Sequence, residues 1–450
     1  MKGGKPMRSP FSKQPPPLHW MPLDNAAKIY PAARRPNWTN VYRLSADLSE
    51  PVDVPTLQSA LGTVVRRFPS MAARLRRGVF WYYLQELSAP PTVREEACYP
   101  LTYMSKAEAR RCALRVIVYK NRVAVEIFHS LTDGNGALVF LKTLLAEYLE
   151  RRYGVTVPAT HGVLDRHDRP APEELEDSFQ KYSGALPASR REHTAWHLSG
   201  TPEQGAFLNL TCLHLPADAT LAKAHEYGVS VTALLCAVMM MALQRWQAEV
   251  VPLRKKRKPV RVLIPVNLRR LYGSRTLRNF VMYTTPEILP QLGDYEFEEI
   301  CRIVKSQMGL DITPKQMSMK IAVNVNSERL MAVRVMPLFI KNIVMKIIFN
   351  TVGECKSCLS LSNLGMVQLP DEMRPYVRRF DFILGVQASA PYNCGVLAYD
   401  NTIYVNFIRN ICESPLERHF YEVLRELGLP VTAESNQREE DDDVLRELRR

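Results

Sequence analysis

His129 lies four residues before Asp133, at a point where the sequence pattern changes twice. Residues 123–128 alternate between apolar and small or polar side chains, which predicts a strand. Residues 132–136 form a turn-type cluster, and residues 138–148 place apolar side chains at helical spacing. The imidazole ordinarily titrates near pH 6.5, so a histidine at a strand end can accept a proton from an alcohol or amine.

The His-x-x-x-Asp spacing alone has little specificity, because it recurs at His161–Asp165 and at His214–Asp218. The first recurrence has no strand pattern before it, and the second leads into Pro216 at an expected helix start. Only the copy that begins at His129 has a strand before it and a glycine directly after the aspartate. Loops held by regular elements commonly carry chemistry, so this copy is the candidate site.

The composition predicts a globular chain that favours anionic partners. Of 450 residues, 46% are hydrophobic and 23% charged, which is enough to build a substantial core of two or three domains. The formal net charge of +13 suits nucleic acid, a membrane surface or phosphate-bearing substrates such as coenzyme A.

The nine cysteines are odd in number and scattered, which indicates reduced thiols and a cytoplasmic location. Cys355 and Cys358 form a lone Cys-x-x-Cys with no second pair, so no metal site is expected. Residues 229–246 are the longest apolar stretch, and we expect a buried core helix there rather than a transmembrane segment. No signal peptide is expected from the basic, proline-rich start.

The chain divides into five segments. Residues 1–17 are expected to be a flexible leader and residues 18–155 the first folded half. Residues 156–205 are polar and rich in proline, as a crossover would be. Residues 206–430 are expected to form the second half, and residues 431–450 a charged, solvated tail.

The elements alternate between strands and helices in both halves, which predicts a mixed α/β or α+β protein. Strands are expected at residues 41–48, 72–87, 115–119, 123–128, 207–213, 260–266, 281–285, 359–365, 380–389, 395–399 and 402–408. Helices are expected at residues 54–68, 138–153, 229–246, 295–310, 337–349 and 413–427.

Three motifs carry a family resemblance. The His129–Gly134 turn resembles the His-x-x-x-Asp-Gly signature of the chloramphenicol acetyltransferase-like superfamily, which includes plant acyltransferases, peptide-synthetase condensation domains and alcohol acetyltransferases. Phe128 stands where many members have a first histidine. The segment with Asn267-Leu-Arg269 and Asn279-Phe280 is similar to a second motif of that superfamily. Ser362-Asn363-Leu-Gly365 resembles a strand end of the alcohol acetyltransferase branch.

The resemblance implies an α+β fold of two similar subdomains, each a two-layer α/β sandwich, with a channel between them. It covers about residues 20–430. The plant Asp-Phe-Gly-Trp-Gly motif is absent, and Asp381-Phe382-Ile-Leu-Gly385 in a comparable region departs from it. The sequence is therefore unlike a plant-type enzyme.

The resemblance also implies roles for the first site residues. His129 would be the catalytic base and Gly134 part of its turn. One interpretation is that Asp133 orients the imidazole, as the aspartate of a catalytic triad does. The family pattern implies instead that Asp133 turns away and pairs with an arginine, with Arg269 the first choice and Arg278 the second. Asn267 would brace the same segment.

Other candidates are weaker. Ser362 and the backbone around Asn363 would stabilise an oxyanion by resemblance, while turn chemistry alone is the competing interpretation. The basic run from 254 to 258 suits the phosphates of coenzyme A, or is simply a solvated loop. It comprises Arg254, Lys255, Lys256, Arg257 and Lys258. Without interleaved aromatic residues, it does not indicate a nucleic-acid partner.

The predicted function is transfer of an acyl group from acyl-CoA, with acetyl-CoA the expected co-substrate, to a small alcohol or amine. Neither an acyl-enzyme nor a bound cofactor or metal is required, and no Gly-x-Ser-x-Gly motif suggests a serine nucleophile. One alternative is a condensation-type enzyme that takes its acyl group from a carrier protein. Another is a non-catalytic binding protein on the same scaffold.

Overall fold

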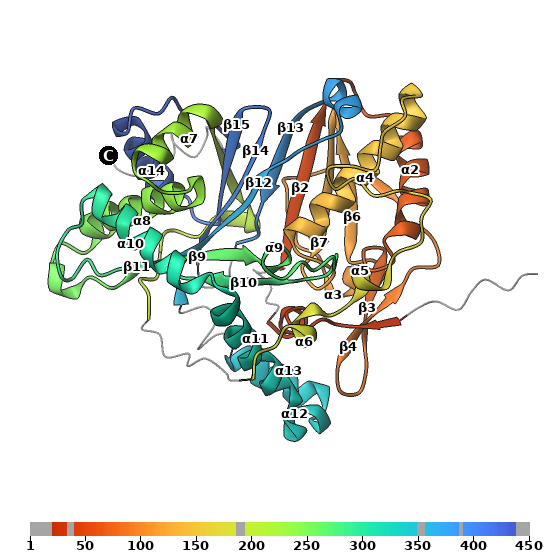
Figure 1. The fold of residues 1–450 in the computed structure, drawn as a ribbon, viewed down its shortest axis with the longest axis horizontal. Helices are drawn as coiled ribbons and strands as arrows, with labels where there is room; N and C mark the ends of the chain where they lie inside the picture. The colour runs from red at the N-terminus through yellow and green to blue at the C-terminus, as the bar shows by residue number, and fades with distance from the viewer. Residues whose placement is uncertain (1–19, 34–39, 186–193, 349–355, 387–389, 438–450) are drawn as a thin grey trace, which may run out of the picture.

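The computed structural model describes residues 20–33, 40–185, 194–348, 356–386 and 390–437. The predicted leader at residues 1–17 and Cys355 lie outside them. Two sheets, each covered by helices, stand side by side in Figure 1, with the N-terminal part of the chain forming one and the C-terminal part the other. The arrangement is the predicted α+β fold with two subdomains.

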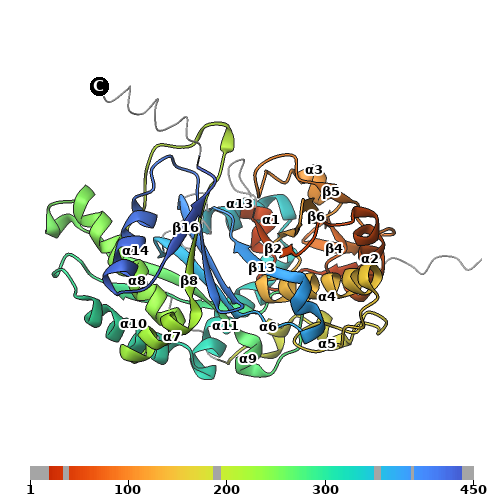
Figure 2. The same ribbon diagram turned by 90° about the horizontal axis from the view of Figure 1, so that it is seen from above.

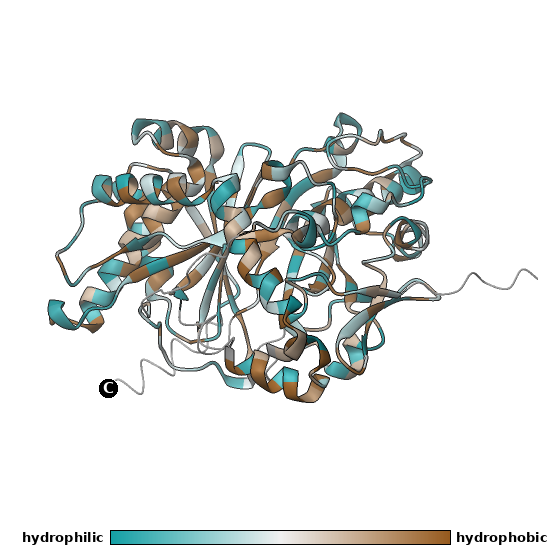
Figure 3. Cartoon of the chain, turned by 60° about the horizontal axis from the view of Figure 1, so that its bottom comes forward, coloured by the Kyte–Doolittle hydropathy of each residue, from teal (hydrophilic) through white to brown (hydrophobic). Residues whose placement is uncertain are grey.

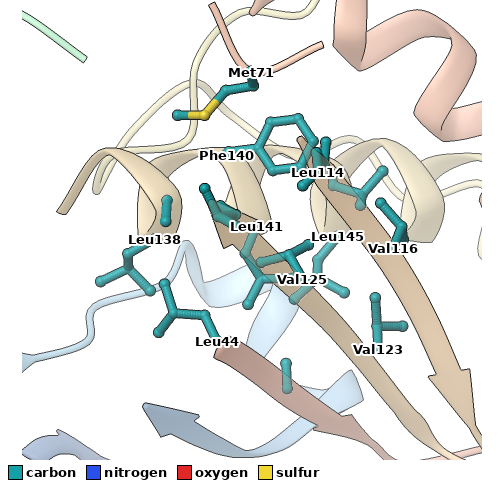
Figure 4. Close-up of a cluster of buried hydrophobic side chains, with 14 of the residues drawn as sticks. Leu44, Met71, Leu114, Val116, Val123, Val125, Leu138, Phe140, Leu141 and Leu145 are labelled. Carbon is teal, nitrogen blue, oxygen red and sulfur yellow. The ribbon is translucent and has the colours of Figure 1, made fainter. Parts of the chain in front are cut away.

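The first half is a five-stranded sheet with two long helices on one face. Its strand order is β13-β2-β7-β6-β5, and α2 (Val54–Arg67) and α4 (Gly134–Tyr153) pack against each other. The strands are β2 (Val41–Leu48), β5 (Val93–Glu95), β6 (Leu114–Tyr119), β7 (Arg122–Phe128) and β13 (Val377–Ile383). Figure 4 shows leucines and Phe140 of α4 meeting valines of β6 and β7 in this core.

A small three-stranded sheet adjoins this half. It has the order β1-β4-β3, from β1 (Trp20–Pro22), β4 (Tyr82–Glu86) and β3 (Ala73–Arg77). Two short helices, α1 (Ile29–Ala33) and α3 (Lys106–Ala109), also belong to this part of the chain.

The second half is built on an eight-stranded sheet of order β10-β9-β12-β14-β15-β8-β16, with β11 also paired to β9. Its strands are β8 (Asn209–Pro216), β9 (Val260–Asn267), β10 (Val281–Thr284), β11 (Glu287–Ile288), β12 (Leu359–Met366), β14 (Tyr392–Tyr399), β15 (Thr402–Arg409) and β16 (Thr432–Ser435). The covering helices are α7 (Ala217–Glu226), α8 (Val231–Val250), α10 (Phe297–Asp311) and α14 (Pro415–Glu426).

Helix α8 is the core helix that the apolar stretch predicted. Among the described residues it alone is long and apolar enough to cross a membrane, but most of it is buried inside the protein. Its side chains pack against α14, α10 and β9. Burial between a sheet and neighbouring helices explains why residues 233–243 of this helix are all apolar.

The described part of the crossover is braced by contacts with the rest of the protein. Residues 156–185 and 194–205 carry α5 (Pro172–Leu175), α6 (Ser178–Lys181) and η1 (Gln204–Ala206). Glu174 forms a buried ion pair with Arg67 at 2.6 Å, and its backbone oxygen accepts from the Leu277 N–H of the second half. The crossover therefore contacts both halves rather than linking them as a free tether.

Two boundaries differ from the sequence prediction. β13, although inside residues 206–430, pairs antiparallel with β2 of the first half, with Ile383 opposite Arg43. Figure 2 shows this strand beside the first sheet. The charged tail also begins later than expected, because residues 432–435 form edge strand β16 on β8. Neither pairing partner is local in sequence, so periodicity alone could not reveal them.

The remaining elements connect β9 to β14. They are α9 (Leu268–Tyr272), α11 (Pro314–Arg329), α12 (Met331–Val335), α13 (Leu338–Ile348) and η5 (Asp371–Tyr376), with η2 (Arg254–Lys256) before β9. Figure 1 shows α11, α12 and α13 projecting from the lower edge of the molecule.

Candidate active site

A pocket of about 360 Å³ opens where the two halves meet. It is lined from the first half by Tyr30, Tyr42, His129, Gly134 and Phe382 of β13, and from the second by Asn267, Asn279, Lys356, Ser362 and Asn363, among others. Most of the lining surface is apolar, and a few polar groups converge on it. This composition is that of a small-molecule site.

His129 is held where β7 ends. Its backbone N–H donates to the carbonyl of Asn40 at 2.9 Å, which continues the pairing of β7 with β2. The imidazole stacks on the Tyr30 ring at 4.4 Å between centroids and meets the edge of the Tyr42 ring at 4.9 Å. Two aromatic rings thus fix the plane of the histidine without using its nitrogens.

The amide of Asn279 determines which ring nitrogen of His129 is free. Asn279 Nδ2 donates to the His129 carbonyl and to Asp24 Oδ2, each at 3.1 Å, so its nitrogen must face those two acceptors. Asn279 Oδ1 then lies 3.1 Å from His129 Nδ1 and must accept a hydrogen bond from an Nδ1–H. The proton of the neutral ring therefore sits on Nδ1, and Nε2 keeps its lone pair.

The surroundings keep His129 neutral. Burial lowers its pKa below the ordinary value of 6.5, and the neighbouring carboxylates of Asp133 and Asp24 only partly oppose that shift. Burial also raises the pKa values of Tyr30 and Tyr42, so both phenols keep their protons at neutral pH. A neutral imidazole with a free Nε2 is the form that a general base requires.

Asp24 supports this arrangement from the segment between β1 and α1. It is fully buried, and its Oδ1 accepts from the Ala27 N–H at 2.7 Å. Arg278 lies 3.7 Å from its other oxygen. Burial raises the pKa of Asp24, and the Arg278 guanidinium opposes that shift. Arg278 therefore pairs with Asp24, and the second-choice pairing with Asp133 is wrong.

Asp133 turns away from the imidazole and joins the two halves. Its Oδ1 caps α4 by accepting the N–H groups of Asn135 and Gly136, both at 3.1 Å. Its Oδ2 accepts the Phe280 N–H at 2.9 Å and pairs with Arg269, also at 2.9 Å. The geometry is the predicted pairing with Arg269 and differs from that of a triad.

Arg269 and Asn267 brace the loop that delivers Asn279. Asn267 Oδ1 caps α9 and lies 3.3 Å from an Arg269 nitrogen. Arg269 also donates to the backbone oxygen of Thr276 at 2.6 Å and to that of Arg278. The arginine thus fixes the segment immediately before Asn279.

The glycines of the turn are required by close packing. A Cβ on Gly134 would lie 2.9 Å from a methyl of Leu364, the end of a flexible side chain. A Cβ on Gly136 would lie 2.1 Å from Thr132 Oγ1 and 2.4 Å from the backbone oxygen of Leu277. The second glycine, which sequence reasoning did not single out, therefore has the stricter requirement.

Ser362 and Asn363 both line the pocket from β12. The side chain of Asn363 is used locally: it donates to Thr232 at 3.0 Å and accepts from the Gly365 N–H at 2.8 Å. The contact with Gly365 is the turn interaction that the sequence offered as the alternative to an oxyanion role for Asn363. Ser362 is half-buried on the pocket wall, and its role stays a prediction.

The basic run at residues 254–258 is not brought to the pocket. It forms the exposed turn η2 and the approach to β9, and Arg257 is engaged by Asp294 at 2.6 Å. Among the described residues lining the pocket, the cation is Lys356, whose Nζ donates to Tyr283 Oη at 3.2 Å.

One cluster elsewhere has metal-ligating residue types. The potential ligand atoms of Cys212, His214 and Glu434 lie within 4.8 Å of one another. However, Arg379 hydrogen-bonds to Cys212 Sγ at 3.4 Å and pairs with Glu434, and burial raises the pKa of the thiol. A guanidinium among the ligands disfavours a second cation, so the cluster does not fit a metal.

Sequence reasoning missed three contributors to the site. Asn279 was noted only as part of a motif, and Asp24 and Tyr30 were not singled out. Tyr30 and Asn279 contact His129 from distant parts of the chain, Asn279 from 150 residues away, and Asp24 acts through Asn279. The sequence offered one signal for these residues, which was the position of Asn279 directly after Arg278 in the second motif.

Comparisons with known proteins show the fold. No family model and no curated protein sequence matches the chain. A Fusarium sporotrichioides TRI101 structure complexed with coenzyme A and T-2 aligns with TM-score 0.62 and 10% identity, over 93% of this chain and 99% of that one.

Two further solved structures are similar. TRI3 trichothecene 15-O-acetyltransferase from the same fungus has TM-score 0.57 and 12% identity, covering 90% of this chain and 94% of its own. The first condensation domain of the CDA synthetase has TM-score 0.54 and 13% identity, covering 91% and 96%. The chain therefore has the chloramphenicol acetyltransferase-like fold that these acetyltransferases and condensation domains share.

Proposed function

We propose that the protein is an acyltransferase in which His129 activates an alcohol or amine for attack on a thioester. The observation that carries the proposal is the Asn279 contact, which leaves His129 Nε2 as the unprotonated ring nitrogen. His129 also lines the pocket between the halves. The thioester donor and the acceptor would both have to bind in this pocket, next to the same imidazole.

The reaction balances without a covalent enzyme intermediate. His129 Nε2 takes the acceptor's proton as the acceptor oxygen or nitrogen bonds to the thioester carbonyl carbon. The carbonyl oxygen becomes an oxyanion. When the carbon–sulfur bond breaks, the thiolate leaves and recovers the proton from the imidazolium. The ester or amide and the free thiol are the products.

The oxyanion needs a hydrogen-bond donor on the wall facing the acyl group. The Ser362 hydroxyl is the candidate that we favour, because it lines the pocket from β12 while the Asn363 side chain is engaged by Thr232 and Gly365. The apolar surface around it would hold the acyl chain and exclude water.

Acyl-CoA is the donor that we favour, with acetyl-CoA first, and an alcohol the favoured acceptor. TRI101 was solved with coenzyme A, and this chain matches nearly its whole length. Lys356 offers the pocket a cation for an anionic part of the donor. A cytoplasmic location would agree with this donor and with the scattered cysteines.

The test is thiol release from a panel of acyl-CoA donors, with and without simple alcohols and amines. Wild type should release thiol in an acceptor-dependent way, and His129→Ala should lose about a hundredfold or more in kcat. His225→Ala, on the exposed face of α7, is the matched control and should retain full activity. Thermal unfolding must show that both variants fold.

Two other outcomes identify the alternatives. Turnover only with an acyl group on a carrier protein would establish the condensation-type reaction. Failure with every donor, combined with equal donor binding by wild type and His129→Ala, would contradict catalysis and favour a binding protein.

A further inference from the structure

Helices α12 and α13 both expose apolar side chains to solvent. On α13, Phe339, Ile343 and Ile347 are 58%, 59% and 56% exposed, and they recur every four residues on one face. Exposed Met331 and Val335 of α12 lie just before them in the chain. Figure 3 brings these helices forward and shows brown, hydrophobic stretches along them.

The polar face of α13 points inward, which is the reverse of a usual surface helix. Lys341 is buried, donates from Nζ to the Phe80 backbone oxygen at 2.8 Å, and lies over the Trp81 ring. Asn342 donates to the Tyr82 hydroxyl at 3.1 Å. Because the polar residues anchor α13 to β4 and the turn before it, rotation cannot hide the apolar stripe.

The same segment carries only positive charge. Between Glu328 and Glu354 the sequence contains four basic residues and no acidic one. Arg334 and Lys346 are exposed, whereas Lys341 is the buried anchor. Glu328 itself is engaged by Lys28 and Asn25, so it does not neutralise the surface.

We propose that α12 and α13 form a docking surface for an anionic phospholipid membrane, with the apolar stripe in the acyl-headgroup boundary. An apolar stripe combined with unopposed cations is the chemistry of interfacial membrane binding. A second copy of the chain fits less well, because a two-fold contact would bring the cations of both copies together.

Docking would bring the pocket near the lipid. Helix α13 packs against α1, and α1 supplies Ile29 and Tyr30 to the pocket lining. A substrate dissolved in the bilayer would then have a short path to His129. Binding itself does not depend on catalysis, so His129→Ala should bind vesicles like wild type.

The experiment is co-sedimentation of the full chain with sucrose-loaded vesicles. One set contains phosphatidylcholine alone, and the other contains phosphatidylcholine with added phosphatidylglycerol. Wild type should bind the anionic set more tightly, and added salt should weaken that binding. The triple variant Phe339→Ser, Ile343→Ser, Ile347→Ser should lose about a hundredfold in affinity.

Controls separate surface chemistry from folding. Leu292→Ser with Leu310→Ser removes two exposed leucines elsewhere and should bind like wild type. Arg334→Gln and Lys346→Gln should each weaken binding to anionic vesicles about fivefold. No vesicle binding by wild type would overturn the proposal. Equal binding to both vesicle sets, or a dimer in solution that the triple variant dissociates, would overturn it too.

Discussion

The Asn279 amide lies 3.1 Å from His129 Nδ1, and the amide's own nitrogen is held by the His129 carbonyl and by Asp24. A side chain of the second half therefore sets the tautomer of a histidine in the first. The base that we propose would therefore be complete only when the two halves are docked, and catalysis would depend on the interface between them.

Replacing Asn279 should impair chemistry more than binding. Asn279→Ala removes the acceptor that keeps the proton on Nδ1, so we expect kcat to fall by about tenfold to a hundredfold with KM little changed. Steady-state kinetics would measure this. Asn121→Ala, in the distant β6–β7 turn, is the control and should leave kcat unchanged. A rise in KM at constant kcat would mean that Asn279 binds substrate instead.

Asp133→Ala should destabilise the protein. It leaves Arg269 without its carboxylate partner and α4 without its cap, and breaking a buried pair costs about 3 to 5 kcal/mol. Activity would be lost because the halves separate or misfold. Denaturant unfolding measures the change directly. A normal melting temperature with no catalysis would instead support a chemical role for this carboxylate.

The pH dependence should follow the lowered pKa of His129. With an acceptor that does not titrate, kcat/KM should be constant above the ordinary value of 6.5 and fall only at lower pH, as the imidazole becomes protonated. The same group contributes to stability: the unfolded chain binds the proton more readily, so stability falls as pH drops below about 6.5. A fall in kcat/KM that begins clearly above pH 6.5 would contradict the prediction that burial lowers the pKa of His129.

Gly136→Ala should prevent correct folding of the turn. The new methyl would meet the backbone oxygen of Leu277 at 2.4 Å, and backbone cannot move aside as a side-chain end can. Gly309→Ala, in α10 with nothing within 4 Å, is the control and should stabilise by roughly 0.5 to 1 kcal/mol. Comparing the melting temperatures of Gly136→Ala and Gly309→Ala separates the effect of the steric clash from the general effect of replacing a helical glycine with alanine.

Ser362→Ala should lower kcat by about a hundredfold if its hydroxyl stabilises the oxyanion. Ser362→Thr keeps the hydroxyl and should recover part of the rate. The comparison is made at saturating acyl-CoA. Equal activity of wild type and Ser362→Ala would remove this residue from the mechanism and leave a backbone N–H as the donor.

Much of the fold could be predicted from local pattern. The alternation of residues 123–128 and the helical spacing that follows are confirmed as β7 and α4, and the apolar stretch near residue 230 as buried helix α8. The pairing of Asp133 with Arg269 was available from a motif. The pairing of β13 with β2, which lie more than 300 residues apart, was not.

The sequence alone determined that a histidine ends a strand and that a helix follows a few residues later, because backbone periodicity is a property of neighbouring residues. The structure added that this helix already begins at Gly134, with Asp133 as its cap. Tertiary structure decided which nitrogen of His129 is free, since Asn279 of the second half, whose amide nitrogen is held by Asp24, reaches the imidazole only after the halves dock. It also decided that the apolar face of α13 points outward, because buried partners hold the polar face. Both outcomes depend on contacts across long sequence separations, which no local pattern records.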